Sequence, residues 1–249
     1  MMNTSTSRKK SPVVRNVRSA DVSKRVYDVL RARAINWELR PGDKINELAV
    51  ASELGVSRTP VREALNRLIS EGMMSFTPNR GFYRRPLDTA EIVNLYEARR
   101  TVEIAAARAA CARASDKDIG KLVSYNSTLM KEKALWSMSV PDMVSADEQF
   151  HETLAALSGN DVYVGILRNI EARIRFVRSI SIESIRDEIA AKGEESLPKG
   201  TLRQHTDILK ALKNRDADAC ASVLEEHISL GLEDAMLLLK EGLSRIYLT

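Results

Sequence analysis

The sequence predicts a mainly α-helical protein with an N-terminal winged helix-turn-helix followed by an all-helical bundle that serves as a ligand-binding domain. Apolar residues recur at helical spacing through most of the 249 residues. Short extended runs typical of a hairpin occur only near residues 73–85. Pro86 lies between the extended runs and the long helical pattern that follows from Asp88, and it marks a boundary between the two. We therefore expect one domain at residues 21–86 and a second at 87–249.

Residues 47–67 read ELAVASELGVSRTPVREALNR and contain two short amphipathic helices separated by a turn at Gly55. The second helix should begin near Arg58, because Ser57 is a good N-cap and Pro60 falls in the first turn, where its missing N–H breaks no helical bond. Its outer face carries polar residues four positions apart, namely Arg58, Arg62 and Asn66. This pattern is typical of a helix that enters the DNA major groove. A helical hairpin with solvated arginines is the alternative.

The flanking segments favour the DNA-binding alternative. Upstream, an amphipathic helix runs from Val22 toward Trp37 and stops at the Pro41-Gly42-Asp43 turn. Downstream, extended runs at residues 73–76 and 82–85 enclose a loop rich in Pro, Asn and Gly. Three helices and a hairpin make a winged helix-turn-helix.

The wing brings further basic residues to the same interface. Arg80 and Gly81 are expected at its tip, with Arg84 and Arg85 behind them, within reach of the minor groove or the phosphate backbone. Arginine matches guanine or phosphate with a planar fork of donors, and Thr59 can contact a phosphate or a thymine methyl group. The predicted DNA-binding residues are Ser57, Arg58, Thr59, Arg62, Arg80 and Gly81.

The run PGDKINELAVASELGVSRTPVREALNRLISEGMM, followed by NRGFYRR, resembles the GntR family of bacterial transcription regulators over roughly residues 21–86. In that family the positions that match Arg58, Thr59, Arg62 and Gly81 meet operator DNA, so the resemblance implies the same roles here. Some relatives also use a basic residue near the start of the preceding helix, where this chain has Leu48.

The charge distribution agrees with a nucleic-acid-binding first half. Residues 1–86 contain 17 Lys and Arg against 8 Asp and Glu, a net charge of +9, whereas residues 87–249 contain 21 against 26, a net charge of -5. A polyanion is attracted to the first half and repelled by the second. Residues 1–20 are basic, have no acid and lack the apolar core of a signal peptide, so we expect a disordered basic arm that either adds nonspecific DNA affinity or aids solubility.

From Asp88 to the end the sequence predicts a helical bundle, since glycines are few and helical periodicity repeats. The expected helices are 88–113, 116–136, 140–157, 161–180, a further piece at 181–192, 200–214 and 216–242. No apolar stretch approaches the roughly 20 residues that a bilayer requires, so no membrane partner is expected. Cys111 and Cys220 are far apart in sequence and offer neither a metal motif nor a disulfide framework, which fits reduced thiols in the cytoplasm.

The bundle contains all three histidines of the chain, His151, His205 and His227. Each lies on the apolar face of its predicted helix, and Asp147 projects beside His151 from four residues earlier. Three imidazoles and a carboxylate that converge inside a bundle form a competent divalent metal site. We predict zinc, with nickel or manganese as alternatives. For any single histidine, a hydrogen-bonded core residue is the other interpretation.

Short motifs carry a second resemblance: LYEARRTVE at 95–103, DEQFH at 147–151, LSGN at 157–160 and the histidines at 205 and 227. In this order they resemble the FadR-type branch of the GntR family, whose C-terminal FCD domain senses ligands. Members with a full Asp/His/His/His set bind a divalent metal, which implies that role for Asp147, His151, His205 and His227. Gln204 departs from the acid that many relatives carry before the histidine, a change expected to affect ligand orientation.

A divalent ion held by three neutral imidazoles and one carboxylate keeps a positive charge and attracts an anion. Arg99, Arg173 and Arg175 are the predicted effector-binding residues, because guanidinium groups clamp carboxylates. Ion pairs with helix acids at the surface are the alternative for each. The resemblance implies a small organic acid, since the family senses such acids.

These observations predict a homodimeric, non-enzymatic repressor of double-stranded operator DNA, released from an inverted repeat by a small carboxylate effector at a metal-centred pocket. One alternative is a metal-dependent hydrolase with a DNA-binding appendage. Against it, the sequence shows no nucleophile motif, no phosphate-binding glycine loop and no further acid or base beside the cluster on the same helix faces. Another alternative is a regulator for which the metal itself is the signal.

Overall fold

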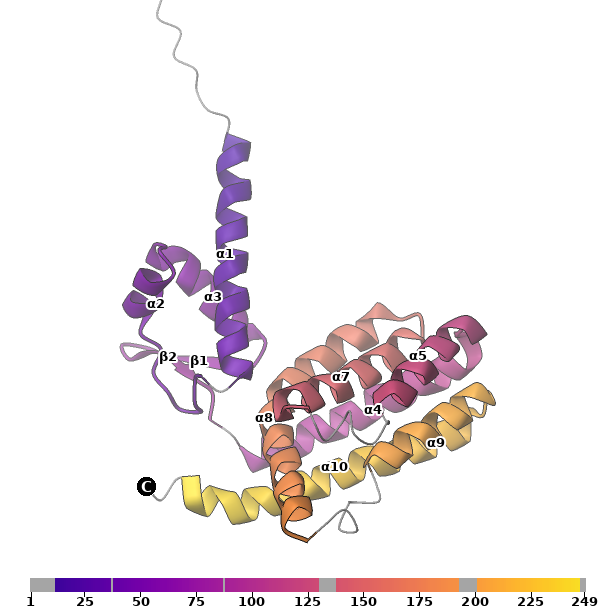
Figure 1. Cartoon of the computed structure of the whole chain (residues 1–249). Coiled ribbons are helices and arrows are strands. Elements are labelled where there is room, and N and C mark those ends of the chain that lie inside the picture. Colours follow the sequence, from indigo (N-terminus) through magenta and orange to yellow (C-terminus); the bar gives the residue numbers. More distant parts are fainter. Residues whose placement is uncertain (1–11, 37, 87, 130–137, 193–200, 247–249) are drawn as a thin grey trace, which may run out of the picture. The chain divides into compact units, whose positions relative to one another are not determined.

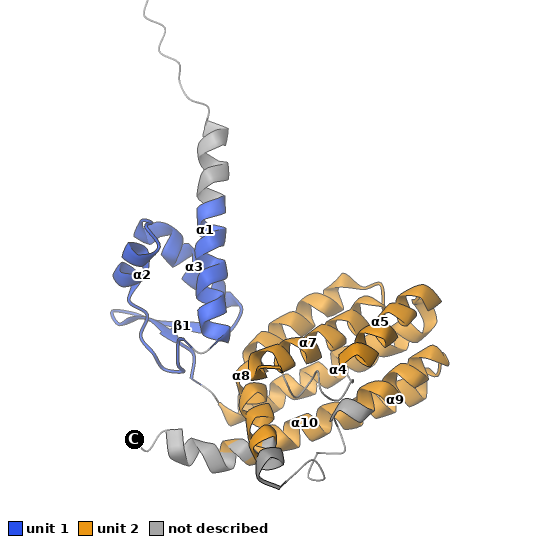
Figure 2. Cartoon of the chain, in the orientation of Figure 1, with its two compact units in different colours: residues 1–86 blue, residues 87–249 orange. Residues whose placement is uncertain are grey.

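The computed structural model describes residues 12–36, 38–86, 88–129, 138–192 and 201–246. The chain divides into two compact units, Met1–Pro86 and Leu87–Thr249 (Figure 2). Helices dominate both units, and the sheet of the described residues has two strands. The predicted fold class is confirmed.

The first unit packs three helices beside a hairpin (Figure 1). Its elements are α1 (Pro12–Ile35), α2 (Glu47–Glu53), α3 (Arg58–Ser70), β1 (Met74–Thr77) and β2 (Gly81–Arg84). The apolar face of α3 is buried against α1, with Val61, Leu65 and Leu68 fully enclosed. The outer face of α3 is left to solvent, as its periodicity predicted.

The hairpin is tied to the chain segment that enters α2. β1 and β2 are antiparallel, with Met74 opposite Arg84 and Thr77 opposite Gly81. The amide of Ile45 donates to the Phe82 carbonyl at 2.9 Å. This third stretch of pairing fixes the wing relative to the start of α2, because ladder hydrogen bonds define both spacing and register.

The first helix begins earlier than the sequence analysis expected. α1 starts at Pro12 rather than near Val22, so residues 12–20, which we had placed in a disordered arm, are helical. Proline is favoured in a first turn, and no glycine or proline follows it before Pro41. No helix-breaking residue therefore separates residues 12–20 from the rest of α1. The remainder of the expected arm, residues 1–11, lies outside the described residues.

The first residues of α2 and α3 are capped in different ways. Asn46 caps α2, and its side chain accepts from the amides of Leu48 and Ala49 at 3.1 Å each. Ser57 occupies the N-cap position of α3 as predicted, but its hydroxyl makes no capping hydrogen bond. The hydroxyl of Ser57 is consequently available at the exposed leading end of α3.

The second unit is a bundle in which α4 packs against α7, α8 and α10 (Figure 1). Its helices are α4 (Thr89–Arg113), α5 (Asp116–Leu129), α7 (Val140–Ala156), α8 (Asp161–Lys192), α9 (Thr201–Lys213) and α10 (Ala217–Ile246). The separate piece expected at 181–192 is instead the continuation of α8, because polar residues there interrupt the apolar pattern without breaking the backbone. The end of the helix expected at 116–136 falls partly on residues 130–137, outside the described residues.

Apolar side chains from every helix of the bundle form its core, including Phe150, Ile174 and Leu224. The free thiols Cys111 and Cys220 are buried in the same core. Among the described residues, no helix combines the length and apolar character needed to cross a bilayer. The core matters for function because it holds α7, α9 and α10 in fixed positions, and these helices carry the histidines.

Truncation of one core residue should loosen the first unit alone. Leu65→Ala removes a fully buried side chain between α3 and α1, and such changes cost about 2–5 kcal/mol of unfolding free energy. Hydrogen exchange of the α1–α3 amides should accelerate accordingly.

Asn66→Ala is the matched control, since Asn66 is the exposed neighbour on the same helix. It should change stability by less than about 0.5 kcal/mol. Unaltered exchange in Leu65→Ala would contradict the packing of α3 described above.

Candidate metal centre and nucleic-acid interface

Three helices bring the predicted metal ligands together in the bundle. α7 supplies Asp147 and His151, one turn apart on the same face, while α9 supplies His205 and α10 supplies His227. One ligand atom from each residue lies within 4.8 Å of the other three. The three histidines are at most 3% exposed. The cluster is therefore a compact set of potential metal-ligand atoms in which the imidazoles are buried and Asp147 is partly exposed.

The distances within the cluster match those between ligands of a single ion. His227 Nε2 lies 3.0 Å from His151 Nε2 and 3.3 Å from His205 Nε2. The Asp147 oxygens lie 3.5 Å from His151 Nε2 and 3.4 Å from His205 Nε2. Ligand atoms held about 2.1 Å from one ion lie about 3.0 Å apart at a right angle and about 3.4 Å apart at the tetrahedral angle. The four residues thus fit a divalent ion.

Hydrogen bonds on the far side of two imidazoles determine which nitrogen faces the cluster as an acceptor. His151 Nδ1 lies 2.6 Å from Glu103 Oε2, and His227 Nδ1 lies 3.3 Å from Gln204 Oε1. Both oxygens accept hydrogen bonds, so each Nδ1 carries the proton and each Nε2 carries a lone pair. The Nε2 atoms of His151 and His227 lie 3.0 Å apart, so their lone pairs repel each other. A cation between them removes this repulsion, which is a chemical reason for a metal at this position.

The electrostatics of the cluster keep its ligands in the forms that bind metal. Burial lowers the pKa of all three histidines, so their imidazoles are neutral at neutral pH. Burial alone would raise the pKa of Glu103, but the charge of Arg99 and the hydrogen bonds from His151 and Arg99 outweigh it, and the pKa falls well below its usual value. Glu103 is therefore an ionised acceptor for the imidazole of His151.

Arg178 on α8 contacts the cluster, and the sequence analysis missed it. Its guanidinium donates to Asp147 Oδ2 and is largely buried. Burial, followed by the positive charge of Arg99, lowers the pKa of Arg178 to about 10, which still leaves the side chain charged at neutral pH. The spacing of Ile174 and Arg178 on one helical face could have indicated that this arginine points inward.

The three predicted effector residues are placed differently from one another. Arg99 is buried and donates to Glu103 Oε1 at 2.6 Å, while its Nη2 has no hydrogen-bond partner among the described residues. The other two form ion pairs within the unit, Arg173 with Glu91 and Arg175 with Glu148. Of the three, Arg99 has the buried donor that a carboxylate could occupy.

The predicted DNA-binding residues lie on exposed parts of α3 and the wing. Ser57, Arg58, Thr59 and Arg62 are exposed at the leading end of α3. Arg80 is exposed in the hairpin loop, and Gly81 follows it with φ of +98°, a left-handed conformation that favours glycine. Arg84 is an exception. It is buried and donates to the Met73 carbonyl at 2.6 Å, so it braces the wing from inside instead of facing DNA.

One acidic residue gathers the two arginines of the recognition helix. Glu47 Oε2 lies 3.3 Å from Arg62 Nε and 3.7 Å from Arg58 Nη2. The guanidinium carbon of Arg62 also lies 5.8 Å from the centre of the Phe82 ring on β2. Both arginine side chains remain about half exposed despite these contacts. The sequence analysis missed Glu47 because this contact joins the starts of two different helices.

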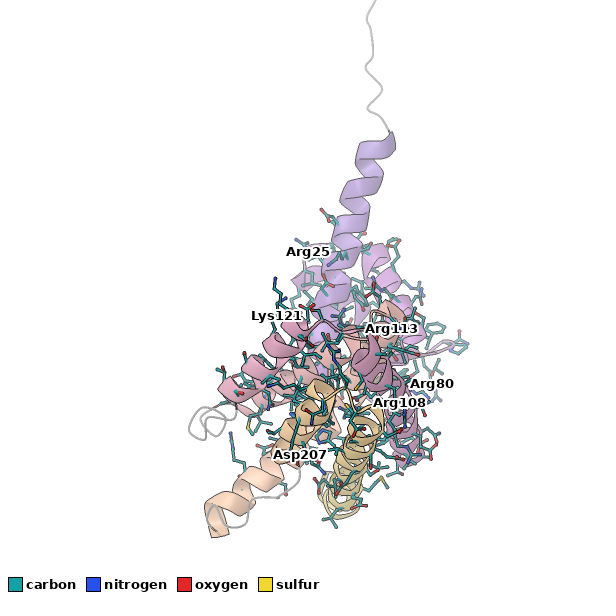
Figure 3. The ribbon with its side chains drawn as sticks, turned by 90° about the vertical axis from the view of Figure 1, so that its right-hand side faces the viewer. Arg25, Arg80, Arg108, Arg113, Lys121 and Asp207 are labelled. Atoms are coloured by element: carbon teal, nitrogen blue, oxygen red, sulfur yellow. The ribbon has the colours of Figure 1, made fainter. Side chains whose placement is uncertain are left out.

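Several cations on the bundle surface have partners inside the same unit, which agrees with the charge asymmetry of the sequence. Examples are Arg108 with Asp218 at 2.6 Å, Arg113 with the Ser158 carbonyl at 3.0 Å, and Lys121 with Asp118 at 2.7 Å. Figure 3 labels these three cations. The Arg80 side chain on the wing has no such partner among the described residues. A polyanion therefore finds available guanidinium donors on the first unit.

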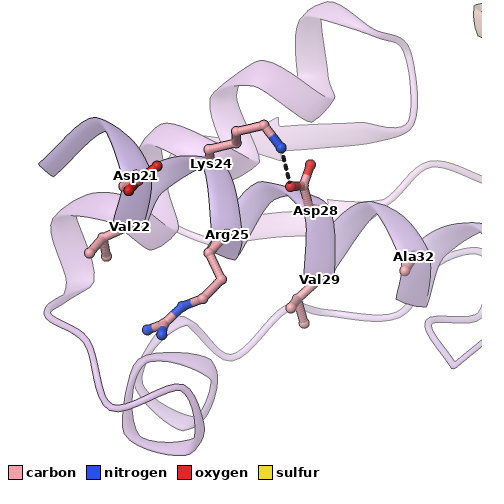
Figure 4. Close-up of a pocket in the computed structure, with 7 residues that line it drawn as sticks. All are labelled: Asp21, Val22, Lys24, Arg25, Asp28, Val29 and Ala32. Atoms are coloured by element: carbon pink, nitrogen blue, oxygen red, sulfur yellow. Dashed lines mark hydrogen bonds and ion pairs between the residues drawn. The ribbon is translucent and has the colours of Figure 1, made fainter. Parts of the chain in front are cut away.

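An open groove along α1 belongs to neither of these two sites. Lys24 and Asp28 on its rim form an ion pair at 2.6 Å (Figure 4). Its lining residues are Asp21, Val22, Lys24, Arg25, Asp28, Val29 and Ala32. None of them belongs to the Asp/His cluster or to the exposed face of α3.

Both halves of the chain match known families. Residues 22–83 match the family described as "Bacterial regulatory proteins, gntR family", and residues 94–230 match the FCD domain. The chain is 36% identical to the Nta operon transcriptional regulator of Aminobacter aminovorans, over 86% of this chain and 94% of that protein. It is 28% identical to the HTH-type transcriptional repressor RspR of Escherichia coli K12, over 83% of this chain and 86% of that protein.

Solved structures share the same fold. E. coli McbR/YncC superposes with a TM-score of 0.69 at 21% identity, and the match covers 87% of this chain and 97% of that one. A putative GntR transcriptional regulator from Rhodococcus sp. RHA1 gives a TM-score of 0.64 at 24% identity, covering 86% and 97%.

The contact between Glu47 and the α3 arginines predicts an effect on sequence-independent DNA binding. Glu47→Gln keeps the shape of the side chain but removes the charge that partly neutralises Arg58 and Arg62. Affinity for a duplex of arbitrary sequence should rise about two- to fivefold, the range of a partly exposed ion pair. Fluorescence anisotropy over a salt series measures this change.

Glu53→Gln is the matched control, because Glu53 lies on the same helix but pairs with Arg33 of α1. It should leave affinity for the duplex near the wild-type value. Equal effects of the two substitutions would show that only the net charge of the unit matters.

Proposed function

The chain belongs to the GntR family of bacterial regulatory proteins and carries an FCD domain, and from this premise we propose that it is a metal-containing repressor released from its operator by a small organic acid. It is a transcription regulator with a DNA-binding domain. The observation that carries the metal part of the proposal is the convergence of three imidazole Nε2 atoms and one carboxylate in the core of the bundle.

In the proposed DNA complex, α3 enters the major groove and the wing contacts the adjacent backbone or minor groove. The residues that would meet DNA are Ser57, Arg58, Thr59, Arg62, Arg80 and Gly81. The exposure of the first five supports this role, as does the ordering of Arg62 against the Phe82 ring. A side chain already held in its binding geometry loses less conformational entropy in the complex.

The proposed metal is a divalent ion, zinc or alternatively nickel or manganese, held by Asp147, His151, His205 and His227. When bound, it supplies a fixed positive charge that attracts an anionic effector. The surrounding residues orient the ligands: Glu103 holds the ring of His151, and Arg178 holds Asp147. Phe150 stacks on the His205 ring at 3.8 Å and sets its plane. Such outer contacts tune both the geometry and the basicity of the ligands.

The effector proposal rests on the arginines around this cluster. Arg99 and Arg178 each present a buried nitrogen without a hydrogen-bond partner among the described residues. A carboxylate between them would satisfy both nitrogens. Arg173 and Arg175, also predicted to bind the effector, would instead position acids on the neighbouring helices through their ion pairs. The contact to the acid is thus assigned to Arg99 and Arg178.

We call the DNA-binding part of the first unit, α2, α3 and the wing, the reading head. In the proposed repression, the regulator presents two reading heads to one operator. We assign a homodimer acting on an inverted repeat, since two-fold symmetric proteins bind two-fold symmetric sites. The acid would release DNA by binding better to the bundle arrangement that misaligns the heads, because a ligand shifts an equilibrium only through differential affinity. The printed name of the E. coli relative RspR describes a repressor, which supports the direction of regulation.

The environment of Glu103 argues against the hydrolase alternative. Glu103 contacts the cluster through His151, and hydrogen bonds from Arg99 and His151 engage both of its oxygens. Its lowered pKa also keeps it ionised. It is therefore poorly suited to carry a proton to or from a substrate. The relatives named above are likewise regulators.

The DNA interface is tested by Arg58→Ala combined with Arg62→Ala. If both contact bases, operator affinity should fall by about 1–3 kcal/mol per half-site for each residue, in a titration against the duplex selected from a random pool. The loss should be larger for the selected duplex than for an unselected one.

Arg67→Ala is the matched control on the same helix, because Arg67 stacks on Tyr27 and pairs with Glu71. It should bind the selected duplex within about threefold of wild type. Wild-type affinity in the double variant would remove α3 as the reading element.

The metal centre is tested by metal analysis of the purified protein. Wild type should contain about one divalent ion per chain, whereas His227→Gln should contain none, because glutamine fills the space without offering an imidazole. Glu103→Gln should retain the ligands but weaken metal affinity about 10–100-fold through the altered support of His151.

Glu226→Gln, at the exposed position preceding His227, controls for changes in α10 itself. Its metal content should equal that of wild type. A stoichiometric ion in His227→Gln would place the metal elsewhere. An operator affinity that follows free metal without any acid would favour the metal as the signal.

A further inference from the structure

Glu171 is a buried carboxyl group for which the described residues supply no hydrogen-bond partner. It lies on α8, on the same face as Ile174 and Arg178, and is 2% exposed. Neither of its oxygens has a hydrogen-bond partner among the described residues. Buried polar groups in proteins are nearly always satisfied, so a carboxyl group in this state indicates a missing partner.

The charges around Glu171 determine what kind of partner it needs. Burial raises the pKa of Glu171 to about 9, with nearby Glu103, Glu148 and Glu152 adding to the effect and Arg99 opposing it. At neutral pH the side chain is mostly a neutral acid with one O–H donor and one carbonyl acceptor. An approaching cation would instead ionise it. In both states the carbonyl side accepts a hydrogen bond that no described residue donates.

The nitrogens that lack partners belong to the same core. Arg99 Nη2 and Arg178 Nη1 are buried and have no hydrogen-bond partner in the part of the chain that the structure describes, and the charge of Arg99 acts on Glu171. Arg178 is bonded to Asp147 of the metal cluster, and Arg99 reaches His151 through Glu103. Two cationic donors and one acceptor are therefore left without hydrogen-bond partners among the described residues of this core, and a ligand that reached all three would satisfy them. A carboxylate satisfies the arginines but leaves the acceptor of Glu171 unmatched.

We infer that Glu171 selects effectors whose carboxylate is accompanied by a hydrogen-bond donor, either a hydroxyl or an amino group. This inference rests on the proposed organic-acid effector and names its class more closely. A plain acid of the same size would leave Glu171 buried and unsatisfied in the complex. Sites built to bond a ligand O–H or N–H reject the analogue that lacks it much more strongly than apolar pockets reject a missing methylene.

The test uses matched acids and the metal-loaded full-length chain. Lactate and alanine are each compared with propionate, and malate and aspartate are each compared with succinate, by titration calorimetry. In at least one series a donor-bearing acid should bind about tenfold or more tightly than its plain counterpart. The hydroxyl and amino members then identify which donor the site takes. Glu171→Met should reduce the ratio to near one with unchanged metal content.

Glu171→Gln and Glu183→Met are the matched controls. Glutamine keeps an acceptor oxygen, so it should preserve much of the discrimination. Glu183 lies exposed on the same helix, and its loss should change nothing. The thermal midpoint without ligand gives a second readout. Glu171→Met should equal or exceed wild type, because it removes an unmatched buried polar group, whereas a carboxyl satisfied by structural water would lose stability.

The outcomes separate this inference from the proposed function. If the acids bind but each matched set binds equally, or if Glu171→Met keeps the discrimination, the role of Glu171 is overturned and the acid effector stands. If none of the acids binds the metal-loaded chain, the organic-acid effector itself is overturned, and this inference falls with it.

Discussion

The main physical constraint on the second unit is that three imidazoles and a carboxylate are packed against one another within its core. Their ligand atoms lie within 4.8 Å of one another, four of the pairs at 3.0–3.5 Å, and the three imidazoles are buried. Neutral imidazoles with lone pairs directed at one another repel, and a partly satisfied polar network is costly in a low dielectric. The apolar packing of α7, α9 and α10 opposes this repulsion in the absence of an ion. A divalent ion would convert the same arrangement into a source of stability.

A chain of charged groups links this cluster to α4 and α8. Arg178 donates a hydrogen bond to Asp147. His151 donates one to Glu103, which also accepts one from Arg99. Any ligand that engages these arginines alters groups on both helices at once. α4 begins directly after the end of the first unit in the sequence. A small shift of α4 would therefore be transmitted to the first unit through the few residues that join them, provided that two arrangements of the bundle exist.

The reading head shows a different use of charge. Its arginines are held only at the edges, by one carboxylate at 3.3–3.7 Å and by an aromatic ring, and they remain about half exposed. Weak, partly solvated contacts of this kind order a side chain without neutralising it fully. Arg84, in contrast, is buried and donates a hydrogen bond to the Met73 carbonyl at the base of the wing. The two kinds of arginine differ in burial, although they lie in the same basic segment.

The sequence by itself determined most of the helices, the face that each turns inward and the four residues that converge in the cluster, although it misplaced the start of α1 and divided α8. These follow from the helical period, since a residue at i+4 shares the face of residue i, as Asp147 and His151 do. Only the tertiary structure decided which residues meet across helices. It placed Glu103 and Gln204 behind the imidazoles, paired Arg173 with Glu91, and left Glu171 without a hydrogen-bond partner among the described residues. The physical reason is that local periodicity fixes the direction of a side chain relative to its own helix axis. The partner on the far side depends on the rotation and register of another helix, which the packing of the whole core sets.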